Sequence, residues 1–346
     1  MAQTSIEAAE TRSSLITRAI VERLLGLALL VAVGVWVVYE AAKQPASFFT
    51  VFLLGVNLGA LYALVALGYT MVYGIIELIN FAHGDLFMLA TVGSAFLMVS
   101  AFGVTTPGVA SVAVMIGAMI LVMIGGAAFN TAAERVAYRR LRKAPKLAPL
   151  ITAVGLSFVY QWVGITWNGS GQRPWKTFLG NEFTVVGVTV QWSLVVVLAV
   201  TIPLLAAMTY LVQRTRHGRA MRATAQDQDA ARLMGIDVDR TIAMTFALGG
   251  ALAGAAGMLY LETMGVTRYD LGFRLGLIAF TSAVLGGIGN LAGAVLGGFL
   301  IGIIQSLNEA FGLGSSWSQT VVFAILIVLM VFKPEGFLGH STTEKV

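Results

Sequence analysis

Long apolar runs without charged residues alternate along the chain with short polar segments. Seven runs exceed the roughly 18 apolar residues that predict a transmembrane helix. They cover residues 48–76, 86–133, 147–172, 183–213, 241–261, 275–308 and 310–332. The run 86–133 is long enough for two crossings, and the turn sequence GVTTPG at 103–108 divides it. With the shorter run 24–39, the pattern predicts an all-α polytopic membrane protein of about ten helices, with eight as the lower limit.

The composition supports this membrane class. Hydrophobic residues make up 58% of the 346 positions, charged residues make up 11%, and the mean hydropathy is +0.84, whereas a soluble domain carries about 25% charged residues. There are no cysteines and only three histidines, so we expect no disulfide framework and no metal site. No GxxxxGK[ST] phosphate loop, HExxH or GxSxG pattern occurs. We therefore expect a chain that is not an enzyme and binds no cofactor itself.

Basic residues predict how the helices are oriented. The segments 134–149 and 214–240 each carry six Lys or Arg residues, more than the other loops carry, and basic loops stay on the cytoplasmic side. Counting spans alternately places both segments and the N-terminal tail, 1–20, on that side. We expect the C-terminal tail, 340–346, there too, and we do not expect a cleaved signal peptide. The net charge of +5 then indicates contact with anionic lipid and not with nucleic acid.

Polar residues interrupt one of the most apolar parts of the chain, in YTMVYGIIELINFAHGD at 69–85. If residues from 48 onward form one helix, their spacing places one set of polar side chains on a single face. This set is Tyr62, Tyr69, Tyr73, Glu77 and Asn80. Ionisable residues inside a membrane usually face the bundle interior or a water-filled path. We predict that this face lines a translocation path, although Glu77 could equally lie at the headgroup level.

His83 and Asp85 follow this face at a predicted break in the helix, and we assign them to the same path. His83 stands before a glycine, and no second histidine or cysteine is nearby. A hydrogen-bonded turn or a helix start therefore explains it better than a metal site does. Asp85 could, like Glu77, lie at the membrane surface instead.

Glycine-rich segments predict where helices pack closely or break. Gly55 and Gly59 are four residues apart, which allows two helix backbones to approach each other. The segment 284–298, VLGGIGNLAGAVLGG, is richer in glycine and contains Asn290, which we assign to the path. A broken or re-entrant helix pair and simple tight packing with a polar turn both explain it. Its likeness to INFAHGDLFMLA is a weak indication of an inverted repeat.

The polar stretch RATAQDQDAARLMGIDVDR at 222–240 is compatible with a short helix that stops at Gly235. Its apolar residues, Leu233, Met234 and Ile236, are not needed by a simple linker. Such a helix between two spans could insert into a groove on a cytosolic partner, or it could lie on the lipid surface. The residues alone do not separate these two possibilities.

Five motifs occur in the order in which they occur in a known transporter family. They are GALYALVALGYTMVYGIIELINFAHGD, ERVAYRRLRKAPKLAPLITAVGLS, RATAQDQDAARLMGIDVDRTIAMTFALGGALAGAAG, FTSAVLGGIGNLAGAVLGG and FKPEGFLG. The chain resembles the H-type permease subunit of branched-chain amino-acid ABC importers over residues 51–339.

This resemblance implies the fold, the partners and a coupling segment. The fold would be an inverted-repeat importer permease with broken or re-entrant helices, spanning residues 21–339 in the bacterial inner membrane. Its partners would be an M-type permease or a second copy of the chain, two cytosolic ATPases that hold ATP and Mg²⁺, and a periplasmic binding protein. The resemblance places the coupling segment at 213–240, and the residues it implies for docking are Ala223, Ala225, Asp227, Ala231, Leu233, Gly235 and Ile236.

Two positions depart from the family pattern. Family members usually have a small residue in place of Glu77 and a glutamate in place of Asp85. Because relatives carry urea, short amides or aromatic acids as well as branched-chain amino acids, the first departure leaves these ligands as alternatives. A secondary transporter driven by sodium or protons, with either carboxylate as the coupling group, is a further alternative, but it would not need a coupling helix.

Overall fold

The computed structural model describes residues 31, 34–76, 80–104, 109–142, 144–145, 147–177, 181–185, 187–333 and 335–339, with side chains of 109 and 110 excepted. The two predicted tails, 1–20 and 340–346, and Glu77 lie outside the described residues, as does most of the run 24–39. The chain divides into two units, Met1–Thr50 and Val51–Val346. In the first unit, residues 34–43 are helical, and Lys43 Nζ lies 5.6 Å from the centre of the Tyr39 ring.

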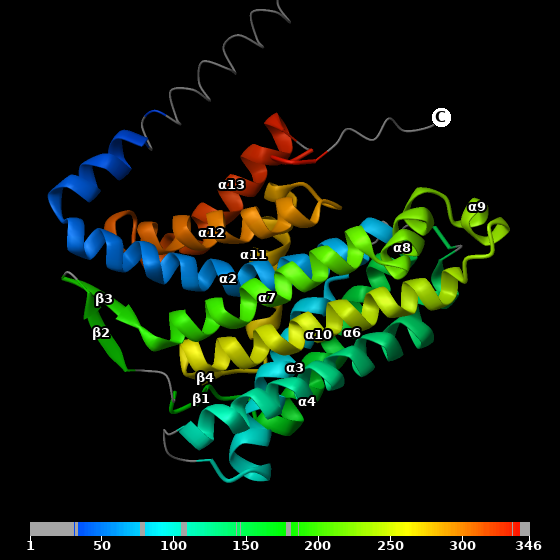
Figure 1. Ribbon diagram of the computed structural model, residues 1–346, viewed down its shortest axis with the longest axis horizontal. Coiled ribbons are helices and arrows are strands. Elements are labelled where there is room, and N and C mark those ends of the chain that lie inside the picture. The colour runs from blue at the N-terminus through cyan, green and yellow to red at the C-terminus, as the bar shows by residue number, and fades with distance from the viewer. Residues whose placement is uncertain are drawn as a thin grey trace, which may run out of the picture. The chain divides into compact units, whose positions relative to one another are not determined.

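Helices dominate the described chain (Figure 1). The α-helices are α2 (Pro45–Ile76), α3 (Ala82–Phe96), α4 (Val109–Ala133), α5 (Arg139–Leu141), α6 (Leu147–Asn168), α7 (Trp192–Arg214), α8 (Arg216–Gln226), α9 (Gln228–Leu233), α10 (Val238–Met264), α11 (Leu271–Gly286), α12 (Leu291–Phe311) and α13 (Ser318–Phe332). Two π-helical turns, η1 (Leu97–Ala101) and η2 (Glu134–Tyr138), extend α3 and α4, and a 3-10 turn, η3 (Ser315–Trp317), precedes α13. The strands are β1 (Arg173–Pro174), β2 (Glu182–Val185), β3 (Val188–Gln191) and β4 (Val266–Thr267).

Within the described residues, eight helices are long and apolar enough to cross a membrane. This number equals the lower limit of the prediction and confirms the all-α polytopic class. The run 86–133 does form two helices, α3 and α4, on either side of the predicted turn. The run 275–308 is also divided, but its first part, α11, has only 16 residues and falls short of the spanning length.

The sequence pattern predicted a transmembrane helix in the run 183–213, but only its second part, α7, is helical. Its first part pairs as an antiparallel hairpin of β2 and β3, in which Phe183 faces Val190 and Val185 faces Val188. Gly187 has a φ of 80° in the connecting turn, a conformation that glycine adopts at no steric cost. Apolar character alone does not distinguish a strand from a helix. The β-branched residues in this part of the run suit a strand better than a helix.

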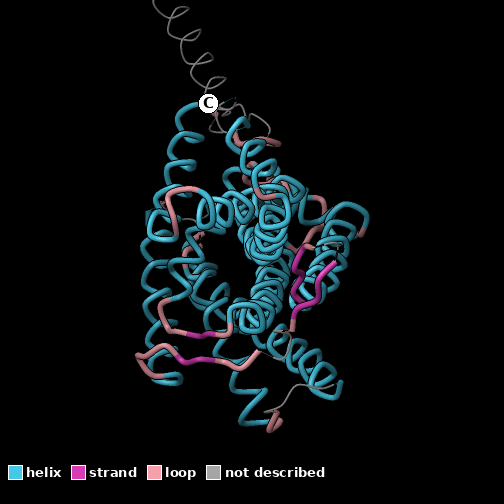
Figure 2. Tube along the Cα trace, turned by 90° about the vertical axis from the view of Figure 1, so that its left-hand side faces the viewer, coloured by secondary structure: helices cyan, strands magenta, loops and turns pink. Residues whose placement is uncertain are grey.

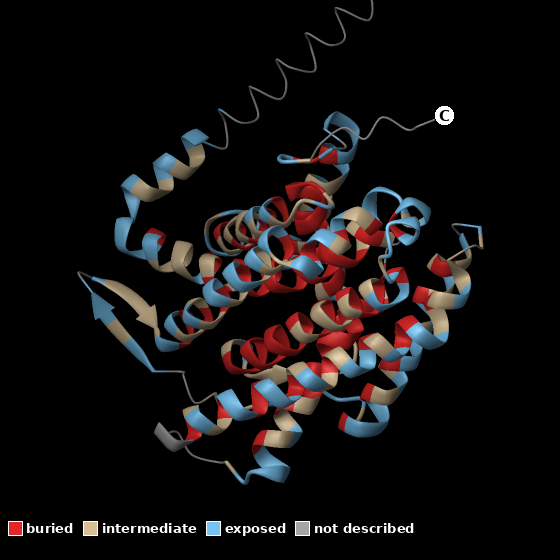
Figure 3. Cartoon of the chain, turned by 45° about the vertical axis from the view of Figure 1, so that its right-hand side comes forward, coloured by how far each residue is buried: buried red, intermediate tan, exposed pale blue. Residues whose placement is uncertain are grey.

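Burial separates central helices from peripheral ones. In its most apolar window α10 has 78% of its residues buried, against 22% for α7 and 17% for α13. The buried residues gather on the helices in the middle of Figure 3, whereas the outer helices carry many exposed positions. Exposed apolar faces on a polytopic chain are suited to lipid or to a neighbouring membrane subunit. We therefore place the core of the second unit around α10, α3 and the buried part of α2.

Close contacts between small residues hold the central helices together. Gly55 and Gly59 of α2 pack against the backbone of α12 at Gly298 and Gly302, as the spacing of the first two glycines predicted. A Cβ on Gly59 would lie 2.7 Å from the Cα of Phe299, well inside normal carbon contact distance. Glycines also join α4 to α10 and α3 to α11. The positions of these helices therefore depend on residues that have no side chain.

Opposite ends of the helical unit carry different structures. The strand pairs β1–β4 and β2–β3 lie at one end, which faces the viewer in Figure 2, while α8 and α9 lie at the other end in Figure 1. The 27 residues of α10 connect these ends. At 1.5 Å per residue this helix is about 40 Å long, which exceeds the roughly 30 Å thickness of a bilayer core. The two ends therefore suit opposite sides of a membrane.

Candidate functional site

A cavity of about 600 Å³ lies at the end that carries the strand pairs. Its wall is built from the first half of α2, the C-terminal ends of α10 and α12, and the start of α11. Its polar lining residues are Asn57, Tyr62, Tyr260, Arg274, Gln305 and Glu309, together with Gln191, Thr263 and Ser306. Pockets of this size and mixed character are typical of small-ligand sites. Of the residues predicted to line a path, Tyr62 lies in this wall.

A chain of hydrogen bonds orders one side of this cavity. The Tyr62 hydroxyl donates to Gln305 Oε1 at 2.9 Å, and Gln305 Nε2 donates to Glu309 Oε1 at 3.0 Å. The Ser318 hydroxyl donates to the same carboxylate oxygen at 2.8 Å. The Tyr62 side chain is almost fully buried, and Gln305 supplies the partner that a buried hydroxyl needs. The result is a carboxylate held in one orientation at the cavity.

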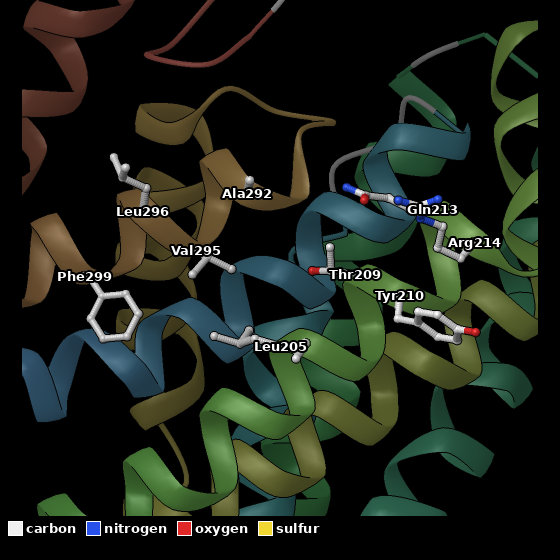
Figure 4. Close-up of a pocket in the computed structure, with 10 residues that line it drawn as sticks. Leu205, Thr209, Tyr210, Gln213, Arg214, Ala292, Val295, Leu296 and Phe299 are labelled. Atoms are coloured by element: carbon white, nitrogen blue, oxygen red, sulfur yellow. The ribbon is translucent and has the colours of Figure 1, made fainter.

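A second cavity, a groove of about 790 Å³, lies between α7 and α12 (Figure 4). Leu205 and Phe299 are among the apolar residues that line most of it, and Tyr210, Gln213 and Arg214 lie at the end nearer α8. Among its lining residues the only charged side chain is that of Arg214. This groove is larger than the first cavity, but it offers charge of one sign only.

The break after α2 is buried and tied to neighbouring helices. Asn80 is buried, and its Oδ1 accepts a 2.7 Å hydrogen bond from the Tyr138 hydroxyl at the end of α4. Asp85, in the first turn of α3, is fully buried and accepts hydrogen bonds from Ser157 and, at 3.3 Å, from Gln161, both on α6. A carboxylate at this position also suits the positive end of the helix dipole. Both residues therefore connect helices within the chain.

His83 and Tyr69 form one aromatic contact at this break. Their rings meet edge to face with centroids 4.8 Å apart, and both side chains are buried. Gly68 lies against the imidazole, because a Cβ there would come within 2.8 Å of Cε1. Tyr73 is half-buried. A role of these residues in translocation stays a prediction, as does that of Glu77, which lies outside the described residues.

Asn290 begins a helix and closes a turn. Its Oδ1 accepts from the Gly293 N–H at 3.1 Å, which caps α12. Its amide group donates to the Leu338 carbonyl at 2.7 Å. The segment 284–298 is thus a helical hairpin in which Gly286 and Gly293 bring α11 and α12 into backbone contact. The predicted break is present, and the side-chain amide of Asn290 at this break forms its hydrogen bonds within the chain.

A cluster of charged side chains lies at the junction of α4 and α10. The sequence did not predict it, because the charges of these two loops indicated only the side of the membrane on which the loops lie. Glu134 is fully buried and pairs with Arg139 at 3.1 Å and with Arg142. Arg142 also pairs with Asp239, in the first turn of α10, at 2.5 Å. The only available signal was a single acid in a strongly basic segment. This cluster fixes the start of α10 beside the α8–α9 segment.

The predicted coupling segment is a folded unit between α7 and α10. Asp227 ends α8 and caps α9, accepting from the N–H groups of Asp229 and Ala230 at 2.8 and 2.9 Å. Asp237 caps α10 in the same way, at 2.9 Å from the Arg240 N–H. Ala231 is buried under the segment. The polypeptide therefore passes from one span to the next through two capped helices.

The tip of this segment exposes apolar side chains. Leu233 is 89% exposed and Met234 is 82% exposed. Gly235 follows with a φ of 80°, and the Ile236 N–H donates back to the Ala231 carbonyl at 3.0 Å, which is the αL helix end that favours glycine. Of the other residues assigned to coupling, Ala225 and Asp227 are exposed, whereas Ala223 and Ile236 are half-buried.

A polytopic helical chain with a charged cavity at one end and a folded apolar tip at the other has the layout of a membrane transport subunit. Residues 51–330 match the family described as the branched-chain amino acid transport system / permease component. The chain belongs to this family of ABC transporter permeases, as its motifs indicated. It is therefore a multi-pass membrane protein that works with other subunits of a transport system.

Relatives resemble the chain over most of its length. The high-affinity branched-chain amino acid transport system permease protein LivH of Salmonella typhimurium is 40% identical over 84% of this chain and 96% of the relative. The corresponding protein BraD of Pseudomonas aeruginosa is 39% identical over the same shares. PsaBC from Streptococcus pneumoniae in complex with Fab aligns with a TM-score of 0.44 and 12% identity, over 86% of this chain and 95% of that one.

Proposed function

We propose that this chain is the permease subunit of an ATP-driven importer that carries branched-chain or closely related amino acids across a bacterial inner membrane. Support comes from the family match over residues 51–330 and from relatives near 40% identity that bear this description. The same match makes urea, short amides and aromatic acids weaker alternatives. The end with α8 and α9 would face the cytoplasm, with both chain termini, as the basic loops predicted.

The exposed tip of the coupling segment carries the proposal. The side chains of Leu233 and Met234 are almost fully exposed, next to a tight turn at Gly235. Burial of such a side chain stabilises a complex by about 1.5–3 kcal/mol, so an exposed pair on a fixed support is typical of a docking surface. A cytosolic ATPase with an apolar groove would bind it by the helix-in-groove mode.

Contacts between the segment and the spans make it suitable as a lever. Gly218 in α8 lies against the carbonyl groups at the end of α7, and Arg222 donates to the Val212 carbonyl. The Thr215 hydroxyl caps α8 at 3.1 Å. Movement of the docked tip would therefore displace α7 and α10 together instead of bending a loop. Two ATPases, each bound to one permease, would drive two such levers, the second on an M-type permease or on another copy of this chain.

The test replaces the apolar tip and leaves the folded segment intact. In the assembled transporter, Leu233→Ser with Met234→Ser should abolish co-purification of the ATPase or the ligand-stimulated part of ATP hydrolysis. Leu338→Ser is the control, because Leu338 is also an exposed leucine, and its carbonyl accepts a hydrogen bond from Asn290, whose neighbours Gly289 and Leu291 share a small pocket with α8. Normal assembly and normal stimulation in the double variant would contradict docking by the tip and favour contact with lipid.

A second measurement separates ATP-driven import from ion-coupled transport. Vesicles that contain the complete complex with its binding protein should take up leucine only when ATP is present. Uptake that continues after the ATPase subunits are removed, and stops when the sodium or proton gradient is collapsed, would establish the secondary transporter instead.

A further inference from the structure

The cavity at the end opposite the coupling segment holds charges of both signs. Arg274 comes from α11 and Glu309 from α12, and both lie in the cavity wall. The Tyr62 hydroxyl, in the same wall, is linked to Glu309 through Gln305 by two hydrogen bonds. We propose that this cavity is a receiving site for a zwitterionic amino acid, in which Arg274 binds the carboxylate and Glu309 binds the ammonium group. This assignment rests on the importer function proposed above and adds the chemistry of recognition.

Glu309 is positioned for a cationic group. One of its oxygens, Oε1, accepts hydrogen bonds from Gln305 and Ser318, at 3.0 and 2.8 Å. No partner for the other oxygen, Oε2, is found in the described part of the chain. A carboxylate held through one oxygen presents the second to an incoming donor without further loss of side-chain freedom. An ammonium group with three N–H donors suits this acceptor.

Arg274 is positioned for an anionic group. None of the ion pairs within the described ranges includes Arg274, and the side chain is exposed where it borders the cavity. Asp270, the acidic residue near Arg274 in the sequence, is paired with Arg268 instead. A guanidinium has a planar set of donors that matches both oxygens of a carboxylate. Within the described residues, the Arg274 guanidinium is therefore available to a carboxylate that enters the cavity.

The rest of the wall suits an aliphatic side chain. Leu54, Leu58, Leu275 and Ile278 line the cavity beside the charged groups. Its volume of about 600 Å³ falls within the usual range for small-ligand sites. A ligand with an ammonium group, a carboxylate and a branched apolar chain uses every part of this lining. A neutral amide or urea would leave both charges unused, and an aromatic acid would leave Glu309 unused.

The alternative cavity lacks this combination. The groove in Figure 4 offers Arg214 as its only charged lining residue and is otherwise mostly apolar. It also lies nearer α8, on the side where the ATPase would bind. The charged cavity lies at the far end of α10, roughly 35 Å from the coupling segment along that helix. In an importer this is the side from which a ligand arrives.

Purified permease in detergent provides the direct test, because weak binding can be followed by saturation-transfer NMR of the leucine methyl groups. The unchanged chain should bind leucine at least about tenfold more tightly than isocaproate, which lacks the ammonium group, or isoamylamine, which lacks the carboxylate. Glu309→Gln should remove the preference over isocaproate alone, and Arg274→Gln the preference over isoamylamine alone. Loss of one charge-assisted contact accounts for a factor of this size.

Controls and transport measurements complete the test. Arg268→Gln and Asp270→Asn change charges on the same side of the chain, outside the cavity lining, and should keep both preferences. In proteoliposomes with the whole complex, Arg274→Gln and Glu309→Gln should reduce maximal leucine uptake about tenfold, whereas Arg268→Gln and Asp270→Asn should keep uptake and basal ATP hydrolysis at the level of the unchanged complex.

Three outcomes would overturn the assignment. The first is binding preferences that do not change in either variant, and the second is unchanged uptake. The third is weaker association of the binding protein with the Arg274→Gln complex while both ligand preferences persist, which would make this arginine a docking contact. Failure of the importer function is a separate result, since it would remove ATP-dependent uptake from the unchanged complex without affecting the NMR preferences.

Discussion

The substitution of glycine by alanine should have opposite effects on stability at two positions, Gly59 of α2 and Gly155 of α6. The difference arises because α2 packs closely on α12 at Gly59. A Cβ on Gly59 would lie 2.7 Å from the Cα of Phe299 and 3.1 Å from the Gly298 carbonyl oxygen, whereas a Cβ on Gly155 of α6 would meet nothing within 4 Å. Carbon atoms in contact are about 3.5–4.0 Å apart. In Gly59→Ala the two helices must therefore separate by about 1 Å.

The sizes of the two effects follow from this geometry. Overpacking of this kind costs about 1–3 kcal/mol, while alanine in place of glycine favours a helix by about 1 kcal/mol. Gly59→Ala should thus lower the free energy of unfolding by up to about 2 kcal/mol, and Gly155→Ala should raise it by up to about 1 kcal/mol. Tyr62 stands one turn from Gly59, so separation of the helices should also weaken its hydrogen bond to Gln305.

Thermal unfolding of the isolated subunit in detergent, followed by tryptophan fluorescence, measures both effects. The midpoint temperature Tm should fall for Gly59→Ala and stay equal or rise for Gly155→Ala. Leucine uptake should decrease only in the first variant. Equal stabilisation by both substitutions would show that α2 and α12 do not approach as closely as the glycine contacts require.

Three further substitutions test the buried polar contacts by the same unfolding measurement. Glu134→Gln should lower the free energy of unfolding by about 3 kcal/mol, because it leaves two arginines without their buried acid; a change below about 1 kcal/mol would mean that the cluster is solvated. Asp85→Ala should cost about 1–3 kcal/mol, since it removes the acceptor for two donors on α6, and a neutral result would argue against this connection. Tyr138→Phe, which loses only the hydrogen bond to Asn80, should cost about 1 kcal/mol, and a much larger loss would indicate an additional role of the hydroxyl.

The predicted translocation face shows what the spacing of residues in the sequence can predict and what it cannot. It placed Tyr62, Tyr69 and Tyr73 on one long helix, as the structure does, because the helical period is a local property. Asn80, the last member of the predicted face, instead lies beyond the end of this helix at Ile76. Spacing could not tell that Tyr62 belongs to a polar cavity while Asp85 connects two helices. That difference depends on which helices pack against each residue.

The cavity itself was not predicted from sequence. In the sequence, Arg274 and Glu309 stand at the two ends of the apolar run 275–308, where interfacial residues are common. Their importance arises because Tyr62 and Gln305, 243 positions apart, meet in one hydrogen bond. No local pattern encodes a contact over this separation.

The sequence by itself determined the membrane class, the lower limit of eight spans, the breaks and the presence of a short helical segment that stops at Gly235. These features follow from the cost of placing charge and unpaired backbone in lipid, which depends on local composition. Only the tertiary structure decided that residues 182–191 form a hairpin, that Asn80, Asp85 and Asn290 have partners within the chain, and that Arg274 and Glu309 border one cavity. Those results depend on close packing between distant helices, which glycines at their contacts permit and which no single segment specifies.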